Sequence, residues 1–133
     1  MVVLRLSKCP KKYFVGTHRA LTPEETLKVV EPKAKVVGVT RVSDITGLDR
    51  VGIPIYSCVR PRAANGAVSV YSGKGVKDVL AKISALMEAI ERYSAEVKPQ
   101  DEGLMIKGSY RELSKQYTVV DLHDSDTSKR VIL

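Results

Sequence analysis

The sequence predicts an α+β protein in which several short strands precede one long amphipathic helix. Short runs of β-branched residues recur in the first half of the chain, and apolar residues with helical spacing cover residues 76–96. The length of 133 residues allows a single domain, residues 1–133, with its own core. We therefore expect mixed or antiparallel strands followed by that helix.

A first, short helix is marked by its start signals. Thr22 suits the N-cap, Pro23 the first helical position, and Glu25 completes a capping box. We expect this helix to end near Glu31, because Pro32 follows. The other elements expected before the long helix are a strand at residues 2–6, a basic loop at 8–19, strands at 36–42, 55–59 and 67–71, and a structured loop at 43–54.

The long helix is predicted over residues 76–96, with an apolar stripe on one side. Ser84, Glu88 and Glu91 follow one another at i, i+4 and i+7, so their side chains share a strip beside that stripe. Small residues above and below the strip leave room for a ligand. The expected stripe consists of Val76, Leu80, Ile83, Met87 and Ile90; one or two helical turns at 109–116, a strand at 117–122 and a polar tail at 123–133 complete the chain.

Two interpretations of this strip stay open on spacing alone. Two carboxylates and a hydroxyl are hard oxygen donors, which suit Mg²⁺ bound together with phosphates. Alternatively, Glu88 and Arg92 form an ordinary i, i+4 pair on a solvated helix face.

The charge balance favours anionic partners. Lys and Arg outnumber Asp and Glu by 22 to 15, a net charge of +7. Nucleotide phosphates, acidic peptides and nucleic acid all fit such a surplus. The basic residues form no dense run and no nucleic-acid recognition motif accompanies them, so weak nucleic-acid binding is a hypothesis that rests on charge alone.

Neither a membrane segment nor a cysteine framework is indicated. No run approaches the roughly 18 apolar residues of a membrane span, and the N-terminus has no signal-peptide core, so we expect a cytoplasmic protein without a membrane partner. Cys9 and Cys58 lack a CxxC spacing and a nearby His, so we expect reduced thiols. The sequence assigns no role to Cys9, Cys58 or His123.

Three glycine-containing segments carry alternative interpretations. Ser72-Gly-Lys-Gly75 precedes the long helix and is either a phosphate-binding turn or a flexible turn, without the full Walker A pattern. Gly16-Thr-His-Arg19 is either a phosphate-contacting or a merely solvated basic loop. Residues 47–54 form either a tight connection with a local ion pair or a loop that shapes a pocket.

Taken together, several segments resemble the YcaO-domain family over residues 12–117. The stretch at residues 46–54 and the helix with the SxxxExxER pattern are the most specific. The segments, in the family's order, are Gly16-Thr-His-Arg19, Thr22-Pro-Glu-Glu-Thr26, Gly38-Val-Thr-Arg-Val42, Thr46-Gly-Leu-Asp-Arg-Val-Gly-Ile-Pro-Ile55, Ser72-Gly-Lys-Gly75 and Ser84-Ala-Leu-Met-Glu-Ala-Ile-Glu-Arg-Tyr93.

The resemblance implies the N-terminal part of a YcaO domain with ATP and Mg²⁺ as cofactors. Family members phosphorylate the oxygen of a peptide-backbone amide, which turns a poor leaving group into a good one. A Cys, Ser or Thr side chain then closes an azoline ring (cyclodehydratase activity), or external sulfide gives a thioamide (thioamidation). A peptide or protein substrate is therefore implied, and the product remains open between the two.

The resemblance also implies roles for particular residues. Glu88 and Glu91 match the Mg²⁺ ligands, and Ser84 matches a nucleotide contact. Arg19 and Thr26 match the N-terminal segment that approaches the nucleotide. It implies that Arg92 either contacts phosphate or pairs with the carboxylates, and it assigns no catalytic residue.

The chain departs from the family in its length. Family domains are much longer, and a complete site uses Glu, Gln and Arg residues from a later region that nothing after Tyr117 supplies. We expect a fragment, a split protein completed by a second chain, or a degenerate half, inactive alone in each case. A homo-oligomer is a separate expectation, because an N-terminal half exposes apolar surface. The rival hypothesis is a non-catalytic, truncated YcaO-like module that docks a partner chain or an anionic peptide.

Overall fold

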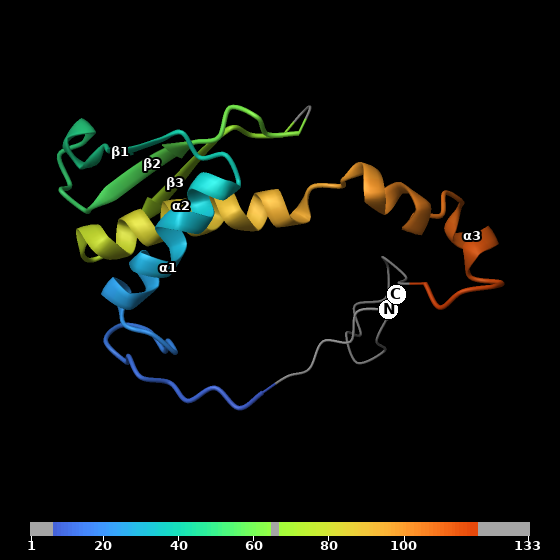
Figure 1. Cartoon of the computed structure of the whole chain (residues 1–133), viewed down its shortest axis with the longest axis horizontal. Helices are drawn as coiled ribbons and strands as arrows, with labels where there is room; N and C mark the ends of the chain where they lie inside the picture. The colour runs from blue at the N-terminus through green and yellow to red at the C-terminus, as the bar shows by residue number, and fades with distance from the viewer. Residues whose placement is uncertain (1–6, 65–66, 120–133) are drawn as a thin grey trace. The chain divides into compact units, whose positions relative to one another are not determined.

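The computed structural model describes residues 7–64 and 67–119, and its order of elements confirms the α+β class (Figure 1). The chain divides into two compact units, Met1–Glu96 and Val97–Leu133. No helix in the described ranges combines the length and apolar character needed to cross a membrane. The elements are α1 (Pro23–Val36), β1 (Arg41–Asp44), η1 (Thr46–Leu48), β2 (Ile55–Val59), β3 (Val70–Lys74) and α2 (Asp78–Ala95) in the first unit, and η2 (Pro99–Leu104) and α3 (Tyr110–Leu113) in the second.

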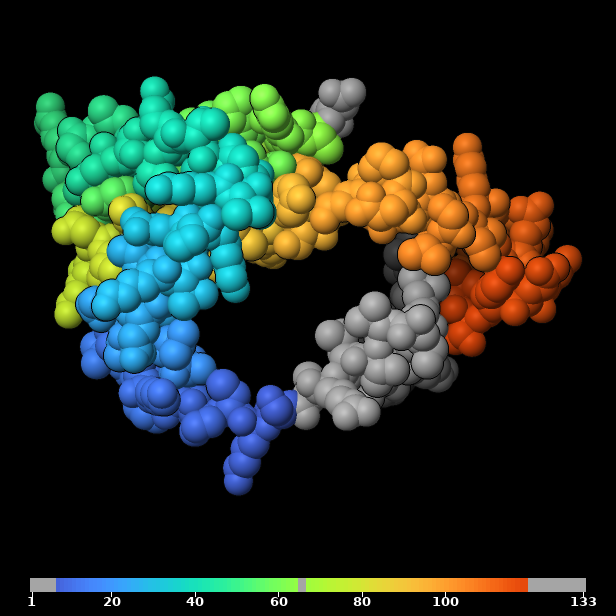
Figure 2. Space-filling model, in the orientation of Figure 1, coloured from blue at the N-terminus to red at the C-terminus, as the bar shows by residue number. Residues whose placement is uncertain are grey.

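The first unit is built on an antiparallel sheet with strand order β1-β2-β3. The register places Val42, Cys58 and Tyr71 side by side across the three strands. Directly paired residues point to the same face of a sheet, and Cys58 and Tyr71 are buried. Helix α2 covers this face of the sheet, and α1 packs against α2 and crosses it in the space-filling view (Figures 1 and 2).

The core lies between the two helices and the sheet, and much of it consists of small side chains. Ala85 and Ala89 are fully buried in α2, which lets the helix axis approach the sheet closely. Leu86 packs on the other side toward Val30 and Ala34 of α1. These contacts fix which side of α2 faces the sheet, which faces α1, and which stays open.

Helix α1 begins as predicted but ends later. The Thr22 hydroxyl accepts from the Glu25 backbone N–H at 3.2 Å, and the Thr22 N–H donates to the Glu25 carboxylate at 2.9 Å. The expected end near Glu31 is wrong, because α1 continues through Pro32 to Val36. A proline removes one helical hydrogen bond, and the buried face of the following turn against α2 offsets that loss.

The strand boundaries differ from the expected ones, except at β2. Because α1 extends so far, the strand expected at residues 36–42 begins only at Arg41, and it takes in the first residues of the expected loop. The strand expected at 67–71 is shifted to Val70–Lys74. Of the later expectations, α3 confirms helical turns within 109–116, residues 117–119 are not a strand, and residues 2–6, 65–66 and 120–133 lie outside the described part.

Candidate functional site

Helix α2 presents Ser84, Glu88 and Glu91 on its open flank. The helix spans Asp78–Ala95 and therefore carries all three, as predicted. An α-helix turns by about 100° per residue, which puts Ser84 and Glu88 opposite Leu86, the residue that faces α1. The strip consequently points away from α1 and borders the sheet.

The apolar stripe predicted for this helix is only partly right. Ile83 is buried, but Val76 precedes the helix and is 81% exposed, and Met87 is 43% exposed. The sheet contacts the alanine side of α2 instead, because small residues allow the closest approach of a helix to a sheet.

The upper end of the strip is closed by β3. A Cβ placed on Gly73 would lie 2.1 Å from the Ala85 nitrogen, 2.4 Å from the Ala81 oxygen and 2.7 Å from the Ser84 carbonyl carbon. The room expected beside Ala81 is therefore filled by the strand. The segment expected to be a phosphate-binding or flexible turn is thus mostly β3, where Gly73 serves close packing.

Glu88 keeps its carboxylate available. Its side chain is 37% exposed, and its Oε1 lies 3.9 Å from Nη2 of Arg92, whose side chain is 66% exposed. An exposed pair at this distance contributes about 0–1 kcal/mol. Among the described residues, Glu91 has no hydrogen-bond or ion-pair partner. Apart from the weak, exposed pair of Glu88 with Arg92, the two carboxylates make no structural interaction among the described residues.

The buried thiol of Cys58 lies close enough to Glu88 for the carboxylate charge to affect its pKa. Its Sγ donates to the Ala85 carbonyl at 3.2 Å. Burial, and secondarily the negative charge of Glu88, raise the pKa of Cys58 to about 11. Glu88 thus lies at the border between the solvent-facing flank and the core, where a charge is incompletely screened.

Two hollows flank α2. One of about 320 Å³ is bordered by Arg92, Ala95 and Glu96 of the helix end together with Ala67, Val68 and Tyr71. Another of about 210 Å³ lies on the α1 flank, where Lys82 pairs with Glu31 at 2.5 Å, and none of the predicted site residues line it. Only the first hollow adjoins the strip.

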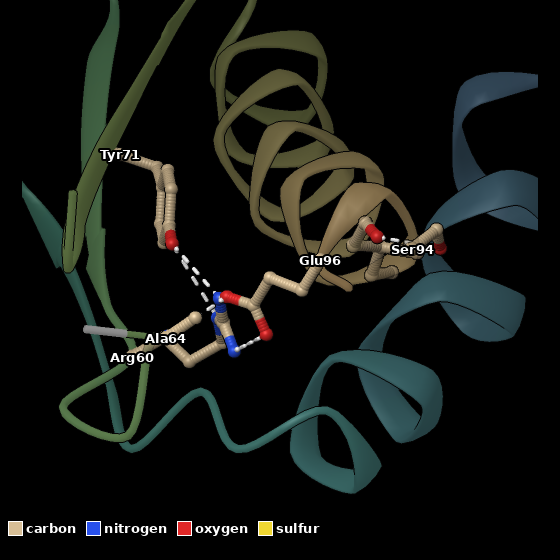
Figure 3. A network of polar contacts seen from close by, with 6 residues as sticks. Arg60, Ala64, Tyr71, Ser94 and Glu96 are labelled. Atoms are coloured by element: carbon tan, nitrogen blue, oxygen red, sulfur yellow. Dashed lines mark hydrogen bonds and ion pairs between the residues drawn. The ribbon is translucent and has the colours of Figure 1, made fainter. Parts of the chain in front are cut away.

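A buried ion pair fixes the C-terminal end of α2 (Figure 3). Arg60 is 1% exposed and donates to both carboxylate oxygens of Glu96. It also donates to the Tyr71 hydroxyl at 3.3 and 3.4 Å, and the Ala64 N–H donates to Glu96 at 3.1 Å. The hydrogen bond with Glu96, the largest effect, raises the pKa of Arg60.

Sequence reasoning missed this pair, because Arg60 follows β2 in a segment that looks like a solvated basic turn. The alternation of side chains along a strand could have indicated its burial. Arg60 lies two residues after Cys58, so the two side chains point to the same face. The pair ties the connection between β2 and β3 to the end of α2, and so sets the position of the turn that carries Glu91 and Arg92.

Arg19 and Thr26 lie apart from the strip. Arg19 is exposed and pairs through its backbone with Tyr13, closing a turn in which Gly16 has φ of +68°. The Thr26 hydroxyl donates to the Thr22 carbonyl at 2.8 Å inside α1. Within the described residues, no hydrogen bond or ion pair links either side chain to α2. Their nucleotide contacts stay predictions.

The donor set fits Mg²⁺ in combination with phosphates. Two carboxylates and a hydroxyl offer hard oxygen ligands, and Mg²⁺ commonly takes one or two carboxylates together with substrate phosphates. No group of three or more His, Cys, Asp or Glu side chains in the described ranges could hold a metal ion. The metal role of Glu88 and Glu91 and the nucleotide contact of Ser84 therefore stay predictions.

Comparison with known proteins supports the resemblance seen in the sequence. Residues 72–130 match the family model described as YcaO cyclodehydratase, ATP- and Mg²⁺-binding. The structure is similar to YcaO from Methanopyrus kandleri bound with AMPPCP and Mg²⁺, with 35% sequence identity and a TM-score of 0.54 over 66% of this chain. The resemblance to the YcaO family is confirmed, and the residues that match the family model contain the whole strip.

Curated relatives agree on the extent of the match. An uncharacterised protein of Methanothermobacter thermautotrophicus is 56% identical over 84 residues, 63% of this chain. One from the tfuA 3' region of Rhizobium leguminosarum bv. trifolii is 40% identical over 83 residues, 62% of this chain. The matched regions make up 22% and 19% of these relatives and 24% of the Methanopyrus chain. This chain thus spans about a fifth to a quarter of the proteins that it matches.

Proposed function

We propose that this chain supplies part of the Mg-ATP site of a YcaO-type protein that activates a peptide-backbone amide. The observation that carries the proposal is the uncommitted carboxylate pair, Glu88 and Glu91, on the open flank of α2. The pair lies inside the segment that matches the ATP- and Mg²⁺-binding family. The Methanopyrus neighbour, which has AMPPCP and Mg²⁺ bound, supports the choice of ligand.

Each residue of the strip has a role in this proposal. Glu88 and Glu91 hold Mg²⁺, Ser84 offers a hydroxyl to the nucleotide, and Arg92 provides positive charge to phosphate oxygens across the adjoining hollow. Bound Mg-ATP supplies the phosphoryl group that makes the amide oxygen a good leaving group. The product is an azoline or a thioamide, and because ATP is an intracellular nucleotide, we expect this activity in the cytoplasm.

The strip offers few ligands, so we propose that the Mg-ATP site on this chain is incomplete. With two carboxylates and one hydroxyl, the 133 residues alone should bind Mg-ATP weakly and should not turn over. Each missing charged contact removes on the order of 1–3 kcal/mol, and every 1.4 kcal/mol is about tenfold in affinity.

The test is a titration of the chain with ATP, with Mg²⁺ or with EDTA, followed by amide NMR. We expect weak saturable binding that requires Mg²⁺, and a loss of about tenfold or more in Glu88→Gln. Glu24→Gln, at an exposed carboxylate in the first turn of α1, should bind like the native chain. Equal affinity in all three proteins would contradict the metal role of Glu88 and favour the non-catalytic docking module.

A further inference from the structure

The hollow on the α1 flank of α2 combines an apolar floor with a positively charged rim. Its volume is about 210 Å³, and its walls come from α1, the connection to β1, β1 itself and α2. Ala34 and Leu86 are buried at its base, and Val39 and Val42 pack against the same core. We call it the basic hollow, because its charged lining consists of three cations and one carboxylate, Lys35, Arg41, Lys82 and Glu31.

The charges of the basic hollow do not cancel. Nζ of Lys82 lies 2.5 Å from Oε1 of Glu31, so these two side chains form a pair. Lys35 and Arg41 are exposed, and neither has an ion-pair partner among the described residues. Three cations against one carboxylate leave a net charge of +2. The hollow therefore attracts anions, and its surplus matches the charge of a dianion.

The wall between α1 and β1 is fixed by the backbone. The N–H groups of Gly38 and Val39 donate to the carbonyls of Lys35 and Ala34 at 3.0 and 2.9 Å. Gly38 has φ of +94°, a conformation that glycine adopts without strain and that ends the helix in this turn. Because the backbone itself satisfies these last carbonyls of α1, the Lys35 ammonium is not needed to cap the helix. A hollow with ordered walls also loses little entropy when a ligand enters.

Size, charge and floor together define the class of ligand. The volume of 210 Å³ lies below the roughly 300–1,000 Å³ of pockets for drug-sized ligands, so the occupant is small. A phosphate monoester carries a charge of about −1.5 to −2 at pH 7, which matches the surplus better than the single charge of a carboxylate. A guanidinium such as that of Arg41 can donate two parallel hydrogen bonds to phosphate oxygens, and an ammonium adds a point charge.

We propose that the basic hollow binds a small phosphate monoester. Arg41 and Lys35 contact the phosphate, and the organic group of the ester covers the apolar floor at Leu86 and Val42. None of the residues assigned to Mg-ATP lines this hollow. The inference therefore goes beyond the proposed function and does not depend on it.

The experiment titrates the 133-residue chain with phenyl phosphate, inorganic phosphate or benzoate, without Mg²⁺ or ATP, and follows the amide NMR signals. We expect saturable shifts at residues 35–42 and 82–86 with phenyl phosphate. Inorganic phosphate should bind more weakly because it lacks the apolar group, and benzoate because it carries a single charge. A titration with phenyl phosphate that does not saturate, or that shifts other residues only, would overturn the proposal. Either control ligand binding as tightly as phenyl phosphate would contradict the chosen class.

Matched variants test the contacts. Arg41→Gln should weaken the binding of phenyl phosphate about tenfold or more, and Lys35→Gln should weaken it as well. Arg62→Gln, at an exposed arginine outside the hollow, should bind within about twofold of the native chain. Glu31→Gln removes the opposing charge and should tighten binding. The amide spectrum of each variant shows whether it is folded.

The remaining outcomes also decide the proposal. Equal weakening in Arg41→Gln and Arg62→Gln would indicate unspecific attraction to a basic surface and would overturn it. Glu88→Gln should bind phenyl phosphate like the native chain, whereas a loss of binding there would place the ligand at the strip instead. A failure of the Mg-ATP proposal and a failure of this one are therefore distinguishable.

Discussion

Replacing Gly73 with alanine tests the packing that positions the strip on α2. The added methyl carbon would lie 2.1 Å from the Ala85 nitrogen, whereas ordinary contacts begin near 3.4 Å. The difference between 3.4 and 2.1 requires a movement of about 1.3 Å between β3 and α2. Overpacking costs about 1–3 kcal/mol and sometimes more, and here the obstacles are backbone atoms that cannot rotate away. We expect a loss of about 3 kcal/mol or more, a large part of the 5–15 kcal/mol typical of a domain.

Urea denaturation followed by circular dichroism measures this loss. Gly47→Ala is the matched control, because a Cβ there has no neighbour within 4 Å and the φ of Gly47 is not positive. At about 4–8 °C per kcal/mol, the melting temperature of Gly73→Ala should fall by more than about 12 °C. A Gly73→Ala variant as stable as Gly47→Ala would refute the close approach of β3 to α2.

Three further predictions follow from individual groups. Burial raises the pKa of Cys58 from 9.0 to about 11. The neutral thiol therefore contributes its full stabilisation of the folded state below pH 9, and this contribution disappears as the pH rises from 9 to about 11. Urea unfolding at pH 8 and at pH 10.5 should show a fall in stability that Cys58→Ala lacks. Arg60→Met removes the guanidinium that faces the Glu96 carboxylate and should cost about 3–5 kcal/mol in urea denaturation. The double variant with Glu96→Met should recover much of that loss, and a double variant no better than the single one would contradict the buried pair. Arg19→Gln should weaken Mg-ATP binding far more than Lys33→Gln. A direct guanidinium contact to phosphate is a charge-assisted hydrogen bond, whereas the charge of a surface lysine is screened within about 8–10 Å. Equal losses of affinity in the two variants that vanish in moderate salt would indicate unspecific attraction to a basic surface.

The sequence predicted those elements whose signals are local. The capping box at Thr22 placed the start of α1, and the helical spacing around Glu88 placed α2 to within about two residues at each end. Both signals act within one turn of helix, so they do not depend on distant parts of the chain. The strip was predicted for the same reason.

Features that depend on tertiary contacts were not predicted. Pro32 stays inside α1 because the following turn is buried against α2, a contact between distant segments. Gly73 suggested a turn, but the structure uses it for the close approach of a strand to a helix. The burial of Arg60 required Glu96, 36 positions later in the sequence. Local patterns contain no information about such pairings.

The central claim is that Glu88 and Glu91 hold the metal of a bound nucleotide. Paramagnetic relaxation tests it most directly, because Mn²⁺ takes the oxygen ligands of Mg²⁺ and broadens the NMR signals of nearby amides. Substoichiometric Mn²⁺ added with ATP should broaden the amides of residues 84–92 first, and Glu88→Gln should abolish that broadening while Glu24→Gln leaves it unchanged. Broadening that begins elsewhere in the chain, or that persists at residues 84–92 in Glu88→Gln, would contradict the account.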